Sequence, residues 1–102
     1  MATEQNLTRI VKMTLRAEEV NAFLAHFEEK KEYIRAFPGC NGLRLIRSVD
    51  QPNILFTYSH WADAADLEAY RHSELFKSTW TYVKTLFEER AEAWSAIVIA
   101  DL

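Results

Sequence analysis

Hydrophobic and polar positions alternate at the start of the chain and then change period. Leu7, Arg9, Val11, Met13 and Leu15 fall on one face at every second position, which is the period of a β-strand. From Ala17 the apolar residues instead follow helical spacing, and this stripe contains Val20, Phe23, Leu24, Phe27 and Ile34. The pattern therefore predicts a strand followed by a helix.

Turn-forming residues then divide the remaining chain. Phe37-Pro38-Gly39 is expected to end the helix, since proline restricts the residue before it and glycine can adopt a positive φ. Asp63 and Ser73 are expected to cap two later helical segments. The remaining predicted elements are strands over Gly42–Ser48, Ile54–Trp61 and Trp94–Ala100 and helical segments over Ala64–Tyr70 and Leu75–Phe87.

This order, β-α-β-β-α-β, predicts a ferredoxin-like α+β fold with an antiparallel sheet and the helices on one face. The chain of 102 residues is expected to form a single domain over 7–100, with 1–6 as a polar N-terminal extension. Two helices cannot cover both faces of a sheet, and an exposed apolar face is an association surface. We therefore expect a homodimer joined through the sheet faces. The apolar residues assigned to that face are Ile10, Ile54, Phe56, Tyr58, Ile97 and Ile99.

Composition excludes several classes of protein. The net charge of −3 argues against binding to nucleic acid or to an anionic membrane. No apolar stretch approaches the roughly 20 residues of a membrane span, and the N-terminus does not resemble a secretory signal. A single cysteine, Cys40, excludes an intrachain disulfide and a CxxC motif. A cytoplasmic protein is the default expectation.

The sequence offers few residues for metal-dependent or nucleophilic chemistry. His26, His60 and His72 form no short ligand pair, and no GxSxG motif or glycine-rich phosphate loop is present. The chain does contain thirteen aromatic residues but only two glycines and two prolines. Tyrosine and tryptophan often line pockets because their polar atoms need partners, although composition alone favours core packing over a site for Trp61, Tyr70 and Trp80.

Four segments together resemble the antibiotic biosynthesis monooxygenase (ABM) family. They are Phe37-Pro38-Gly39-Cys40, Phe56-Thr57-Tyr58-Ser59-His60-Trp61, Ala65-Asp66-Leu67 and Ser73-Glu74-Leu75-Phe76. The resemblance implies a dimeric α+β barrel with a pocket between the sheet and the helices of each subunit. It also implies an oxidoreductase that oxygenates a quinol or anthrone without metal or flavin, so no cofactor is expected.

The family's site residues can be carried over position by position. The resemblance implies that Trp61, Thr57 and Tyr70 are hydrogen-bonding pocket residues, with Val11 and Trp80 as apolar walls. An asparagine of the anthrone-type enzymes is replaced by Thr57, and a histidine of many members is replaced by Tyr70. The candidate catalytic residues are then Trp61, Tyr70 and, as the nearby imidazole base, His72.

Other functions of the same fold remain open at this stage. The replaced asparagine and histidine favour a non-catalytic ligand-binding or dimerisation module, and isomerase or lyase chemistry would need only a base and a pocket. Haem degradation is disfavoured because Trp80 occupies the position of the axial histidine. If Thr57 and Trp61 face the helices, strand alternation places His60 with the interface residues.

Overall fold

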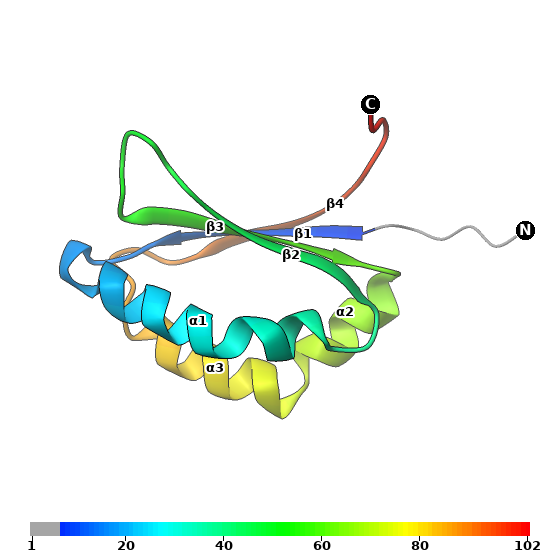
Figure 1. The fold of residues 1–102 in the computed structure, drawn as a ribbon, viewed down its shortest axis with the longest axis horizontal. Helices are drawn as coiled ribbons and strands as arrows, with labels where there is room; N and C mark the ends of the chain where they lie inside the picture. The colour runs from blue at the N-terminus through cyan, green and yellow to red at the C-terminus, as the bar shows by residue number, and fades with distance from the viewer. Residues whose placement is uncertain (1–6) are drawn as a thin grey trace, which may run out of the picture.

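The chain folds as a four-stranded antiparallel sheet with its helices on one face (Figure 1). The computed structural model describes residues 7–102. Its elements are β1 (Leu7–Thr14), the 3-10 turn η1 (Ala17–Glu19), α1 (Val20–Arg35), β2 (Cys40–Arg47), β3 (Ile54–Trp61), α2 (Ala64–Arg71), α3 (Glu74–Lys84) and β4 (Glu92–Ile97). The strand order β2-β3-β1-β4 confirms the ferredoxin-like α+β fold.

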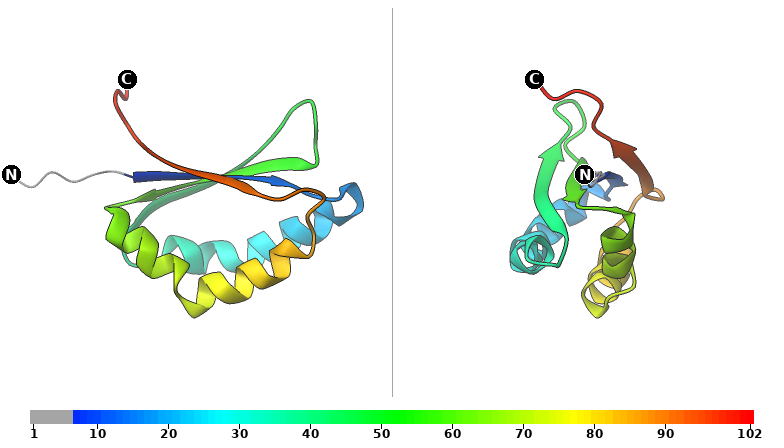
Figure 2. Two further views of the ribbon diagram at one scale, coloured as in Figure 1. Left: turned by 180° about the vertical axis from the view of Figure 1, so that it is seen from behind. Right: turned by 90° about the vertical axis from the view of Figure 1, so that its right-hand side faces the viewer.

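The helices form one layer beneath the sheet. Helices α1 and α3 run side by side under the same face, and the end view shows the opposite face without a covering helix (Figure 2). Among residues 7–102, no helix is long and apolar enough to cross a membrane.

The helix starts confirm the capping residues that the sequence predicts. The carboxylate of Asp63 accepts a hydrogen bond from the backbone N–H of Asp66 at 3.0 Å, and α2 begins at the next residue after Asp63. The hydroxyl of Ser73 accepts one from the N–H of Phe76 at 3.1 Å and starts α3 in the same way. Each cap satisfies a donor that a helix N-terminus leaves unpaired.

The predicted bounds differ from the structure at the last helix and the last strand. The last helical segment was expected to reach Phe87, whereas α3 ends at Lys84 and Phe87 instead forms a bridge with Leu15. We expected Trp94–Ala100, whereas β4 covers Glu92–Ile97 because its pairing with β1 runs from Glu92 opposite Lys12 to Ile97 opposite Leu7. The first helix also differs: it begins with a 3-10 turn at Ala17 and becomes α-helical at Val20.

The register of β4 corrects the predicted dimer face. Ser95 pairs with Arg9 and Ile97 pairs with Leu7, so Ile97 lies on the helix side of the sheet and not on its outer face. Ile99 lies beyond the strand. The outer face of β4 instead carries Trp94, opposite Ile10. Alternation could not decide this, since both sets of alternate positions in 94–99 contain apolar residues.

Two hydrophobic clusters hold the helices to the sheet. The larger one is centred on Met13, Leu15 and Leu55 and includes Phe23 of α1 and Val83 of α3. The smaller one joins Cys40, Trp61 and Leu67 where α2 meets the ends of β2 and β3. The space between these clusters contains the candidate site described below.

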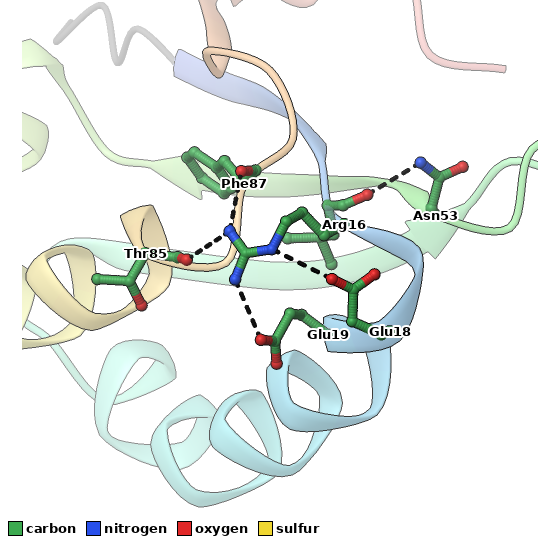
Figure 3. Close-up of polar contacts among 7 residues, drawn as sticks. Arg16, Glu18, Glu19, Asn53, Thr85 and Phe87 are labelled. Carbon is green, nitrogen blue, oxygen red and sulfur yellow. Dashed lines mark hydrogen bonds and ion pairs between the residues drawn. The ribbon is translucent and has the colours of Figure 1, made fainter.

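Beyond the end of β1, Arg16 joins η1 to the C-terminal end of α3 (Figure 3). Its guanidinium donates to the carbonyl oxygen of Thr85, at the end of α3, at 2.9 Å. It also contacts the carboxylates of Glu18 and Glu19 at 3.5 and 3.1 Å. Beside it, the side-chain amide of Asn53 donates to the carbonyl of Leu15 at 2.9 Å. These bonds satisfy groups that the end of β1 and the C-terminus of α3 would otherwise leave unpaired.

A glycine with positive φ forms the corner between α1 and β2. Gly39 has φ +87°, and a Cβ at this position would overlap the side chain of Asp66 in the first turn of α2. Both the backbone conformation and the close approach of α2 therefore require glycine.

We predict that Gly39→Ala lowers the free energy of unfolding by about 1–3 kcal/mol, because alanine is strained at positive φ. Urea denaturation followed by circular dichroism measures this change. Gly42→Ala is the matched control, since Gly42 has no positive φ and its Cβ would stand 3.1 Å from Cδ2 of the His60 ring. Equal losses in the two variants would contradict this account of Gly39.

Candidate active site

A cavity of about 280 Å³ lies between the sheet and the three α-helices. Its walls are mostly apolar, with Phe23 and Phe27 contributed by α1 and Phe76 and Trp80 by α3. The polar side chains that line it are Arg9, Thr57, Ser59, Tyr70, Arg71 and Thr79. Pockets of this kind, apolar with a few polar groups, are typical of sites for small molecules.

The strand register explains why the cavity forms at this place. Two adjacent rows across the helix side of the sheet contain short side chains: Ala93 and Thr57 flank Val11, and Ser95 and Ser59 flank Arg9. The next rows on either side hold larger side chains, with buried Met13 beside buried Leu55 in one and partly buried Leu7 beside buried Trp61 in the other. The helices are thus held off the sheet at both ends, and the space between is left open.

The structure brings together four of the residues that the sequence singled out. Val11, Thr57, Tyr70 and Trp80 all line the cavity. Trp80 stacks on Phe76, with ring centroids 5.8 Å apart and planes at 12°, and meets Phe87 edge-on at 5.6 Å. Trp80 is therefore packed into one wall, and the cavity beside it stays open.

Trp61 lies behind the cavity wall and takes no direct part in lining it. The side chain is fully buried, and its indole N–H donates to the hydroxyl of Ser59 at 2.9 Å. Its ring stacks on Tyr70 with centroids 5.0 Å apart. The expected donor to a ligand is thus already used within the protein, and Trp61 acts on the cavity by positioning Ser59 and Tyr70.

Burial raises the pKa of the Tyr70 hydroxyl to about 12, with a smaller contribution from the nearby Cys40. Phe37 packs edge-on against its ring at 5.3 Å and Phe76 does so at 5.2 Å, which accounts for the loss of water around it. Tyr70 therefore stays protonated near neutral pH. It can donate a hydrogen bond to a ligand anion, but it cannot serve there as a base.

None of the three histidines lines the cavity. His72, the expected base, is exposed at the end of α2, where its Nε2 lies 3.2 Å from the carboxylate of Glu68. His60 lies on the outer face of the sheet beside Thr8, with Nδ1 3.1 Å from the threonine hydroxyl. His26 packs against Tyr82 between α1 and α3, and burial lowers its pKa. Within 7–102, no group of three or more metal-ligating side chains is gathered.

Sequence reasoning missed four of the polar residues at the cavity: Arg9, Ser59, Arg71 and Thr79. Alternation does place Arg9 and Ser59 on the helix side, but it cannot show that the space there is open. The hydroxyl of Thr79 is buried without a hydrogen-bond partner among the described residues. A buried hydroxyl in that state is available to a ligand.

We predict that Tyr70 titrates about two pH units above an exposed tyrosine. Tyr70→Phe should remove the last-ionising component of the ultraviolet tyrosinate titration, whereas Tyr33→Phe, at an exposed position of α1, should leave that component in place.

The same titration has a consequence for stability. The phenol is neutral below pH 10 in both states, and above that pH the unfolded chain ionises first, so rising pH destabilises the fold. Between pH 10 and 12, wild type should lose about 2 kcal/mol more unfolding free energy than Tyr70→Phe. Equal slopes for both proteins would show that Tyr70 is not shielded from water.

Comparison with known proteins gives the family. The family model described as antibiotic biosynthesis monooxygenase matches residues 6–81. Among curated proteins no sequence matches this chain.

Solved structures share the fold at low sequence identity. A conserved protein from Methanosarcina mazei Go1 is 18% identical with a TM-score of 0.87, covering 91% of this chain and 92% of its own. Rv0793 from Mycobacterium tuberculosis is 18% identical with a TM-score of 0.86 over 94% and 97%. A structure described as antibiotic biosynthesis monooxygenase is also 18% identical, with a TM-score of 0.85 over 92% and 99%. From the family match and the shared fold, this chain belongs to the antibiotic biosynthesis monooxygenase family.

Proposed function

We propose that this protein is a cofactor-independent monooxygenase that acts on a small aromatic, quinol-like substrate. The observation that carries the proposal is the cavity of about 280 Å³, whose apolar walls hold a few hydrogen-bonding groups in a chain of the ABM family. The size lies near the lower end for small-molecule pockets, which fits a substrate of one or two rings.

The reaction needs little from the protein besides a shaped and dry site. A phenol loses its proton, and the electron-rich anion reacts with O2. One oxygen atom joins the ring to give a quinone, and the other leaves as water with the two hydrogen atoms that the phenol loses. The apolar walls would exclude water, and preorganised donors would stabilise the anion.

Thr57 and Tyr70 are the donors that we assign to the substrate oxygen. Both line the cavity, and the high pKa of Tyr70 keeps its proton available for donation. Trp61 is then a positioning residue, because its own N–H is bonded to Ser59 and its ring holds Tyr70. The cavity supplies no imidazole, so the substrate proton would pass to water at the mouth.

We predict O2 uptake above autoxidation when chelator-treated protein is given a panel of hydroquinones and anthrones. Tyr70→Phe should lower kcat by at least about ten-fold, because removal of one preorganised donor commonly costs more than that. Tyr33→Phe removes the same hydroxyl from an exposed position and should leave the rate unchanged. Rates equal to autoxidation across the panel would overturn the proposed activity.

A second function is favoured by the absence of a base from the cavity among residues 7–102. A ligand-binding module of the same fold would bind members of the panel without consuming O2. Isomerase or lyase chemistry would convert them equally well under nitrogen. Parallel measurements of binding, of aerobic turnover and of anaerobic turnover therefore separate the three functions.

We also propose that the protein is a homodimer joined through the outer face of the sheet. No described element covers this face, which carries Ile10, Ile46, Ile54, Phe56, Tyr58 and Trp94, together with His60 (Figures 1 and 2). Neighbouring apolar side chains on four strands form a surface suited to a second copy of itself.

We predict a dimer mass by sedimentation equilibrium for the wild type and a monomer for Phe56→Glu, because a buried carboxylate would oppose association. Val49→Glu adds the same charge at a position that is 95% exposed and should leave the dimer intact. A monomeric wild type would contradict the proposal.

A further inference from the structure

One end of the cavity carries positive charge. Arg9 reaches it from β1 and Arg71 reaches it from the last turn of α2. Burial lowers the pKa of the Arg9 guanidinium, and the charge of Arg71 lowers it further, whereas the carboxylate of Glu68 raises it. Two like charges at one site are unfavourable unless a partner of opposite charge joins them.

Arg9 has no such partner among the described residues. Its guanidinium donates one hydrogen bond to the hydroxyl of Ser95 at 3.0 Å, and no carboxylate of 7–102 forms an ion pair with it. Since a guanidinium has five N–H donors, most of its capacity remains unused.

The carboxylate whose charge acts on Arg9, that of Glu68, is already shared with two other side chains. Glu68 is 3.2 Å from the guanidinium of Arg71 and 3.2 Å from the imidazole of His72, on the exposed face of α2. Its single negative charge therefore leaves Arg9 uncompensated, and the charged end of the cavity keeps a net positive charge.

We propose that the cavity binds an aromatic carboxylate, with the carboxylate held at Arg9 and Arg71 and the ring lying between the apolar walls. Guanidinium groups match the planar carboxylate in two-pronged hydrogen bonds. The cavity volume of about 280 Å³ leaves room for one or two rings. If this carboxylate is the substrate, the inference rests on the proposed function, and the substrates are aromatic hydroxy acids. As a binding site it stands independently.

The test compares two probes of the same shape, 2-naphthoate and 2-naphthamide, by calorimetric titration. Wild-type protein should bind the naphthoate at least about ten-fold more tightly, because hydrogen bonds to a charged group are the stronger ones. Arg9→Gln and Arg71→Gln should each reduce that preference, with unchanged binding of the amide showing that the fold is intact. Arg9→Lys should restore part of it.

Lys77→Gln is the control, because Lys77 is exposed on α3, is not part of the cavity lining, and loses the same charge. The inference would be overturned if the wild type bound both probes equally or did not bind naphthoate. It would also be overturned if Arg9→Gln and Arg71→Gln both kept the preference for naphthoate. If wild-type protein prefers naphthoate to naphthamide but consumes no O2 above autoxidation, only the proposed monooxygenase activity is overturned.

Discussion

The contact between Trp61 and Tyr70 fixes the geometry on which the cavity depends. Trp61 is the last residue of β3, and Tyr70 lies in the last turn of α2, so their stacked rings set the distance between the sheet and that helix. Complete burial of the indole requires a partner for its N–H, and Ser59 provides one at 2.9 Å. One side chain thereby holds two cavity residues in place from behind.

Aromatic contacts extend this constraint along the whole wall. Tyr70 meets Phe76, Phe76 stacks on Trp80, and Trp80 meets Phe87. The row therefore runs from the end of β3 to the segment beyond α3. Large, rigid rings of this kind lose little conformational freedom when ordered, so they can keep a cavity open where flexible aliphatic side chains would fill it.

The parts of the fold that depend on neighbouring residues could be predicted from the sequence. Asp63 and Ser73 each cap a helix through a hydrogen bond to a residue only three positions further along the chain. The corner at Gly39 follows from local backbone geometry. The side of β4 that faces the helices could not be predicted in this way. It is set by the pairing of Ser95 with Arg9, which are 86 residues apart.

The same distinction applies to the candidate site. The family resemblance pointed to Val11, Thr57, Tyr70 and Trp80, and all four line one cavity. It also suggested Trp61 as a donor to the ligand and His72 as a base. A sequence does not show that the N–H of Trp61 is bonded to Ser59, or that His72 points away from the cavity at the end of α2. Arg9 and Arg71 could not be predicted as site residues, because charged residues are common on strands and helices. Only the folded structure shows that both line one cavity.

The two chemical characters of the cavity arise from the same packing. The short side chains that flank Arg9 and Val11 open space beneath the helices, and Phe23, Phe27, Phe76 and Trp80 cannot extend far enough to close it. The rings packed around Tyr70 keep water from its hydroxyl, which stays neutral. Arg9 is only partly withdrawn from water and stays charged, because a guanidinium keeps its proton at any physiological pH. A neutral donor and an uncompensated cation at one cavity favour a ligand with an apolar ring and a negative charge.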